Sequence, residues 1–145
     1  MLSFFTAGYQ DETPPSFIAK LNAARVNLLV DVRQNPFSFK MGFNRSQLEV
    51  VCGQSGINYV HIKELGTPIP LRNFLKETGD YKQFFSRYNG ILNEYEDLVE
   101  DLVSLSTKNK VCILCFEKSH LMCHRQVIAN KVLEISGNML SVCHL

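Results

Sequence analysis

The chain has 145 residues, of which 46% are hydrophobic and 20% are charged, and its formal net charge is +1. This composition excludes a disordered chain, because the apolar fraction is high and the net charge is small. It also argues against a protein that coats duplex phosphates, since such proteins are usually strongly basic. The length predicts a single domain over residues 1–145.

Short apolar runs alternate with longer stretches of helical periodicity along the chain. In chain order the predicted elements are a strand at 3–6, a helix opening at Pro14 and Pro15, a strand at 26–32, a helix at 46–55, a strand at 57–62, an irregular segment at 63–79, a helix at 80–105 interrupted near Asn89 and Gly90, a strand at 110–116, a helix at 121–135 and a strand at 139–144. Strands that alternate with helices are typical of an α/β fold with a largely parallel sheet, here of about five strands.

Two features of the sequence bear on the compartment. The longest apolar stretch, residues 111–116, is far shorter than the ~18–20 residues that span a bilayer, and the N-terminus lacks the segments of a signal peptide. The cysteines, at positions 52, 112, 115, 123 and 143, are odd in number, which argues against a disulfide framework. We therefore expect a cytoplasmic protein with no membrane partner.

Polar side chains collect where four of the predicted strands end. These ends are Thr6-Ala7-Gly8-Tyr9, Asp31-Val32-Arg33, His61 and Cys115-Phe116-Glu117. Ligands of open α/β sheets bind at the carboxyl ends of the strands. The sequence therefore predicts one shared pocket at this edge.

The segment Cys123-His124-Arg125 opens a predicted helix. A helix N-terminus presents free N–H groups and a positive dipole end, which lower the pKa of a thiol and favour anions. Cys123 is therefore a candidate thiolate, Arg125 an anion ligand, and Glu117 a general acid or base. The alternative is that Cys123 is simply buried and that Glu117 and Arg125 form a structural ion pair. We assign Cys115 to packing, as a small apolar residue at a strand end.

A second set of candidates follows the second predicted strand. Arg33 can bind a phosphate or carboxylate through its guanidinium group, with Asp31 orienting it. The alternative is an Asp31–Arg33 pair that only fixes a loop. The loop that follows interleaves Phe37, Phe39, Lys40, Phe43 and Arg45, a pattern that suits base stacking beside phosphates. We favour packing of these phenylalanines onto the domain.

A metal site is the less favoured interpretation, and we predict none. Cys112, Cys115, His120, Cys123 and His124 lie within thirteen positions. However, Cys112 and Cys115 are three residues apart in a predicted strand and therefore point to opposite faces. Many zinc sites have two Cys-x-x-Cys pairs, but this chain has no second pair. The Cys-x5-Arg pattern of cysteine phosphatases and the common nucleotide-binding fingerprints are also missing.

Taken together, these motifs resemble the domain-of-unknown-function family four-eighty-eight. The resemblance rests on Thr6-Ala7-Gly8-Tyr9, on the Asp-Val-Arg-x-x-Pro-x-Ser stretch from Asp31 to Ser38, and on Cys115-x-Glu117 with Cys123-His124-Arg125. It covers nearly the whole chain and implies a single-domain, Rossmann-like, three-layer α/β fold. It also implies that the signature residues form one site, but it brings no established reaction.

Three functions compete at this point. The first is an enzyme that acts on a small anionic substrate, such as a nucleotide or a modified base; Glu117, Cys123 and Asp31 would be catalytic, and Arg33, Arg125, Tyr9, Ser38 and His124 would bind the substrate. The second is a non-catalytic module for nucleotides or single-stranded nucleic acid. The third is a thiol redox or metal-responsive protein that uses Cys115 and Cys123. The sequence indicates no particular cofactor.

Overall fold

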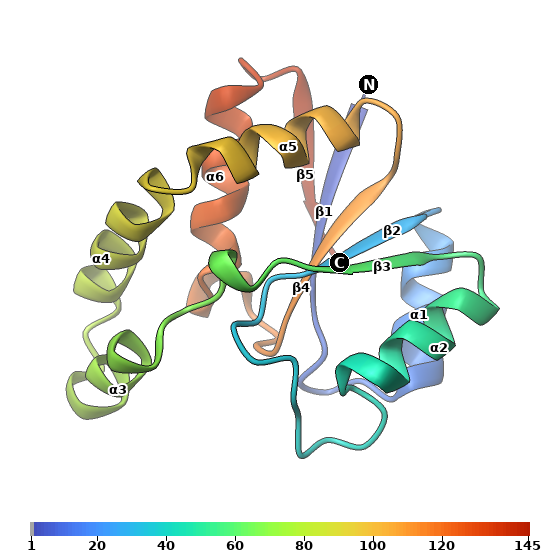
Figure 1. Cartoon of the computed structure of the whole chain (residues 1–145), viewed down its shortest axis with the longest axis horizontal. Helices are drawn as coiled ribbons and strands as arrows, with labels where there is room; N and C mark the ends of the chain where they lie inside the picture. The colour runs from blue at the N-terminus through green and yellow to red at the C-terminus, as the bar shows by residue number, and fades with distance from the viewer. Residues whose placement is uncertain (1) are drawn as a thin grey trace.

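The computed structural model describes residues 2–145, and these form one five-stranded sheet in which all strands are parallel (Figure 1). The strand order is β3-β2-β4-β1-β5. The strands are β1 (Leu2–Gly8), β2 (Leu28–Asp31), β3 (Asn58–His61), β4 (Val111–Cys115) and β5 (Leu140–His144). The predicted α/β class with about five strands is confirmed.

Helices cover both faces of the sheet and make three layers (Figure 1). On one face lie α1 (Pro14–Ala23) and α2 (Arg45–Gln54); the other carries α3 (Ile69–Thr78), α4 (Tyr81–Asn93), α5 (Glu96–Ser106) and α6 (Arg125–Ile135). All five side chains of β4 are buried, as expected of a central strand covered on both faces. Cys112 packs on the α1 side and Cys115 on the α6 side, which confirms that they point to opposite faces.

The prediction that residues 63–79 form an irregular segment is wrong. It contains a single 3₁₀ turn, Lys63–Leu65, and then α3. Pro68 is the N-cap of this helix and Pro70 lies in its first turn, where proline costs no hydrogen bond. Gly79 ends the helix in the left-handed region, with φ of 65°.

The break between the next two helices also differs from the prediction. We expected it near Asn89 and Gly90, but α4 runs through both residues and ends at Asn93. The backbone N–H groups of Glu94 and Tyr95 bond to carbonyls three residues back, which tightens and closes the last turn. A glycine inside a helix costs only about 1 kcal/mol, so Gly90 does not break it. At the last helix, a 3₁₀ turn over His120–Met122 precedes α6, which begins at Arg125 rather than at residue 121.

The strand register brings the predicted strand ends together. Gly8 of β1 is level with Cys115 of β4, and Asp31 of β2 pairs with Leu114 of β4 and with His61 of β3. The loops after β1, β2 and β4 therefore leave the same edge of the sheet. No helix within residues 2–145 has the length and apolar character needed to cross a membrane.

Candidate functional site

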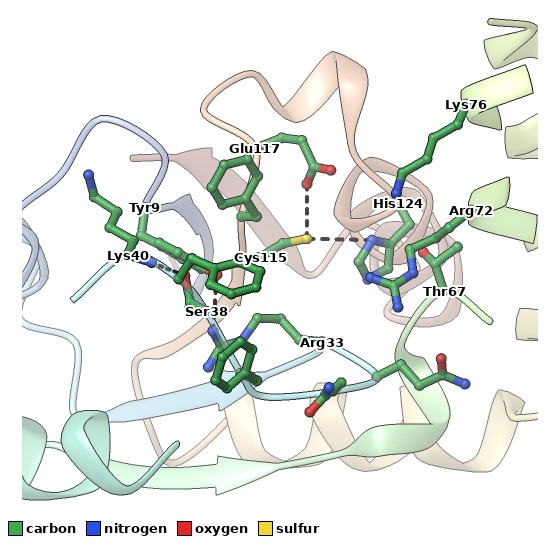
Figure 2. A pocket seen from close by; sticks show the side chains of 15 residues that line it. Tyr9, Arg33, Ser38, Lys40, Thr67, Arg72, Lys76, Cys115, Glu117 and His124 are labelled. Atoms are coloured by element: carbon green, nitrogen blue, oxygen red, sulfur yellow. Dashed lines mark hydrogen bonds between the residues drawn. The ribbon is translucent and has the colours of Figure 1, made fainter. Parts of the chain in front are cut away.

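A cavity of about 540 Å³ opens at the carboxyl ends of β1, β2 and β4 (Figure 2). Five of the eight predicted site residues line it, namely Tyr9, Arg33, Ser38, Glu117 and His124. Asp31, Cys123 and Arg125 do not line it. His61, at the end of β3, borders a separate hollow and bonds the carbonyl of Arg33.

Cys115 is the thiol that reaches the cavity. Its Sγ lies 3.2 Å from Glu117 Oε2 and 3.6 Å from His124 Nδ1 (Figure 2). The hydrogen bond from Cys123 and the charge of His124 lower the pKa of Cys115 well below its ordinary value, although burial acts in the opposite direction. A thiolate is the form of cysteine that attacks electrophiles and binds metals. The assignment of Cys115 to packing alone therefore missed its reactive surroundings.

Cys123 does not have the lowered pKa that its position before α6 suggested. Its backbone is extended, with φ of −137° and ψ of 146°, and His124 is the N-cap of the helix. Burial and the neighbouring Cys115 raise the pKa of Cys123 well above its ordinary value. The structure thus places Cys123 as a buried cysteine beside Cys115 and not as a thiol facing the cavity.

Glu117 and His124 flank Cys115 on two sides. Burial and the charge of Cys115 raise the pKa of Glu117 to about 7. A carboxyl group of this kind can give and take a proton near neutral pH. Burial lowers the pKa of His124, but the charge and hydrogen bond of Cys115, together with the hydrogen bond to the Val32 carbonyl and the charge of Glu117, outweigh it and raise the pKa.

Arg33 is held by a buried network. Its Nε and Nη2 donate to the two carboxylate oxygens of Asp31 at 2.8 and 2.6 Å, and its Nη1 donates to the Tyr9 hydroxyl and the Phe43 carbonyl at 3.1 and 2.8 Å. The hydroxyl of Tyr59 donates to the same carboxylate. Asp31 therefore fixes the orientation of Arg33, and only one of the five guanidinium N–H groups is left for a ligand.

Arg125 holds a loop instead of facing the cavity. It is 1% exposed and donates to Thr6 Oγ1 and to the carbonyls of Glu117 and Lys118. The structure does not place Arg125 at the predicted anion site, because its side chain is buried outside the cavity lining and donates three hydrogen bonds within the protein. The predicted alternative of an ion pair with Glu117 is also wrong, since the contact is to the backbone carbonyl.

The loop after β2 presents aromatic side chains to solvent. Phe39 is 98% exposed and Phe37 is 53% exposed, whereas Phe43 is buried and stacks on Tyr9 at 4.6 Å. Packing, which we favoured for all three phenylalanines, holds only for Phe43. Ser38 lies between them, and its Oγ accepts a hydrogen bond from the backbone of Lys40 at 3.0 Å.

Sequence reasoning missed two cations that line the cavity. Arg72 and Lys76 lie one turn apart on α3 (Figure 2), and Lys40, on the loop after β2, also lines the cavity. Among residues 2–145, no acidic side chain forms an ion pair with any of the three. The missed signal was the proline pair Pro68 and Pro70, which opens the helix that carries Arg72 and Lys76.

The same cluster contains atoms that could hold a metal ion. Cys115 Sγ, Cys123 Sγ and a ring nitrogen of His124 lie within 4.8 Å of one another. The sequence analysis named these three residues among five possible ligands but disfavoured a metal, because it relied on the geometry of the Cys112–Cys115 pair. The cluster forms because the turn between β4 and α6 returns Cys123 and His124 to the end of β4.

Comparison with known proteins gives one match. The model of the family described as "Domain of unknown function DUF488" matches residues 13–132. No curated protein and no solved structure matches the chain. The match covers most of the chain, including the loop after β2, the helix α3 and the Cys115–His124 cluster. The chain therefore belongs to the DUF488 family, as its sequence motifs suggested.

Proposed function

We propose that this protein is an enzyme that acts on a small anionic substrate carrying a planar ring, such as a nucleotide or a modified base. The observation that carries this proposal is the make-up of the cavity. Its lining includes cations that have no acidic partner among residues 2–145, exposed aromatic rings, and a thiol in contact with a carboxyl group.

The cations supply affinity for the anion. Lys40, Arg72 and Lys76 line the cavity, and Glu117 is the acidic side chain among its lining residues. A hollow lined mainly by one sign of charge concentrates ligands of the opposite sign. The guanidinium of Arg72 can bind a phosphate or carboxylate through two hydrogen bonds, and Lys76 adds a point charge one turn away.

The exposed aromatic rings supply a surface for a planar group. Phe37 and Phe39 meet edge to face, with ring centroids 5.2 Å apart, and both are exposed. Exposed rings beside a cation such as Lys40 are suited to stacking on a base, a contact worth about 1–3 kcal/mol.

The thiol and the carboxyl group supply the chemistry. Glu117 is half-buried beside Cys115 and faces the space where a ligand would sit (Figure 2). We assign Glu117 the role of proton donor and acceptor because of this position. Asp31, Arg33 and Tyr9 then act as positioning residues that keep the loop after β2 in place.

The first test is a thermal-shift screen of nucleotides, nucleosides, nucleobases and inorganic phosphate, because a ligand that binds the native state raises Tm. Hits are then measured by calorimetry with Arg72→Ala and Lys76→Ala, each expected to weaken binding about tenfold. Lys82→Ala is the matched control, since Lys82 is an exposed lysine on α4 outside the cavity. Equal affinity of both cavity variants and wild type would contradict the anion site.

The second test concerns catalysis. With a ligand in hand, turnover is followed by product analysis for wild type and Glu117→Gln. We expect Glu117→Gln to bind the ligand but to lose at least a hundredfold in kcat, since general acid–base groups contribute about 10²–10⁴-fold. Full activity of this variant would remove Glu117 from the chemistry.

The exposure of Phe39 beside Lys40 favours one other candidate, a non-catalytic module for nucleotides or single-stranded nucleic acid. The small net charge of +1 counts against a polymer ligand. Binding that is lost in Phe39→Ala, without any turnover of the ligand by wild type, would select this candidate instead.

A further inference from the structure

We propose that Cys115, Cys123 and His124 bind a zinc ion that has one coordination position open to the cavity. The donor atoms come from the end of β4 and from the two residues before α6. The metal site stands without the proposed function, whereas its use in hydrolysis rests on that function.

The spacing of the donor atoms fits a tetrahedral ion. Cys115 Sγ and Cys123 Sγ each lie 3.6 Å from Nδ1 of His124, and all three atoms lie within 4.8 Å of one another. Zinc binds sulfur at about 2.3 Å and imidazole nitrogen at about 2.0–2.1 Å, so tetrahedral geometry separates a sulfur and a nitrogen by roughly 3.5 Å. The two sulfur–nitrogen distances are therefore close to those of a tetrahedral zinc site.

The orientation of His124 is fixed from behind. Nε2 bonds the backbone carbonyl of Val32 at 3.0 Å; a carbonyl only accepts, so Nε2 carries a proton. Nδ1 therefore faces the two sulfurs, and its own proton is displaced when a metal binds. Histidine ligands of metals commonly donate their other N–H to a carbonyl in this way. Tyr88 packs edge-on against the ring at 5.1 Å and further restricts it.

The open position follows from what lies on each side of the cluster. Cys115 and His124 line the cavity, whereas Cys123 is 1% exposed and does not. Structural zinc sites have four protein ligands. Sites with three protein ligands, such as two thiolates and one imidazole, keep the fourth position for water or substrate. Among residues 2–145, the structure brings three possible metal ligands together at this cluster, which leaves the fourth position open.

Glu117 completes a hydrolytic arrangement. Its Oε2 lies 3.2 Å from Cys115 Sγ on the cavity side. A water at the open position would pass a proton to Glu117, and the resulting hydroxide would form a bond to an electrophilic carbon of the substrate. The leaving group, such as the amine of an amino-substituted base, would depart with the proton from Glu117. Zinc deaminases of bases use the same donor types with a neighbouring glutamate.

The test uses the full chain, stripped of metal and titrated with Co²⁺, then with Zn²⁺. We expect one equivalent of Co²⁺ to give visible bands of tetrahedral geometry and a thiolate-to-metal charge-transfer band, all removed by Zn²⁺. Cys123→Ser should lose part of the charge-transfer band and weaken zinc binding at least a hundredfold. Cys143→Ser is the control, because Cys143 is an exposed cysteine outside the cluster.

Two results would overturn the proposal: the absence of a charge-transfer band in wild type, or zinc binding as tight in Cys123→Ser as in wild type. His124→Gln is a second variant, and circular dichroism shows whether each variant is folded. Glu117→Gln should bind Co²⁺ as wild type does; loss of binding would make Glu117 a fourth ligand and close the open position. A protein that binds zinc but no nucleotide, nucleoside or base would refute the proposed function alone. A protein that binds such a ligand but does not bind zinc would refute the zinc site alone.

Discussion

Gly8, the last residue of β1, lies directly against the loop that carries Glu117. A Cβ atom at position 8 would be 1.8 Å from the carbonyl oxygen of Glu117 and 3.0 Å from Nη1 of Arg125. Contacts of a Cβ below 3.0 Å essentially do not occur, so Gly8→Ala must push the loop away by roughly 1.2 Å or more. The obstacle is backbone and cannot rotate aside.

The size of the effect follows from what holds the loop. Overpacking a close-fitted site typically costs about 1–3 kcal/mol. Because Arg125 ties the carbonyls of both Glu117 and Lys118, we expect a loss near 3 kcal/mol in the free energy of unfolding. A displacement of about 1 Å at a reacting group can also cost ~100-fold in rate, so activity should fall as well.

Urea denaturation followed by circular dichroism measures this change. Gly90→Ala is the matched control, since Gly90 lies within α4 and nothing surrounds its added Cβ within 4 Å. The control should gain about 0.5–1 kcal/mol from better helix propensity. A Gly8→Ala protein as stable as wild type would refute the reasoning.

Two more predictions concern buried polar groups. Asp31→Asn leaves the buried guanidinium of Arg33 without its counter-charge, and urea denaturation should show a loss of about 3 kcal/mol. Burial and the charges of His120 and Arg125 lower the pKa of His144 to about 4 in the folded protein. As the pH falls, His144 therefore takes up a proton in the unfolded chain before it does so in the folded protein. The contribution of neutral His144 to stability should therefore be fully present above about pH 6.5 and be lost as the pH falls towards 4. Over this range, Tm should fall less in His144→Gln than in wild type.

The controls for these predictions come from exposed groups. Glu49→Gln breaks the exposed pair with Arg45 and should cost less than about 1 kcal/mol; an equal loss in Asp31→Asn would contradict the role of burial. For the pH dependence, the same slope of Tm between pH 5 and 6.5 in wild type and His144→Gln would exclude His144 as its source.

The strands were predictable because their apolar runs leave few alternatives. Residues 26–32 and 110–116 are nearly continuous apolar stretches, as expected of strands buried on both faces, and they correspond to β2 and β4. The end of such a strand also fixes where its polar residues emerge. For this reason the sequence located Arg33 and Glu117 at one edge of the sheet.

The partners of these residues could not be predicted from the sequence. Arg33 follows a strand and Arg125 opens a helix, and both positions are typical of anion ligands. Tertiary contacts, however, occupy most N–H donors of Arg33, and the hydrogen bonds of Arg125 are all to other residues of the protein. Cys115 and His124 meet only because the turn between β4 and α6 reverses the chain. Their spacing of nine residues carries no periodicity that would have shown it.

The position of β1 between β4 and β5 has a consequence for how the chain folds. β1 comprises residues 2–8, but its neighbours are residues 111–115 and 140–144. During synthesis β1 must therefore wait for more than a hundred later residues before either edge is paired. Pairing over such sequence separations is slow, because loop-closure entropy is lost before contacts form. Until then the exposed edges of β1 are open to other chains, so β1 is the segment that most needs protection during synthesis.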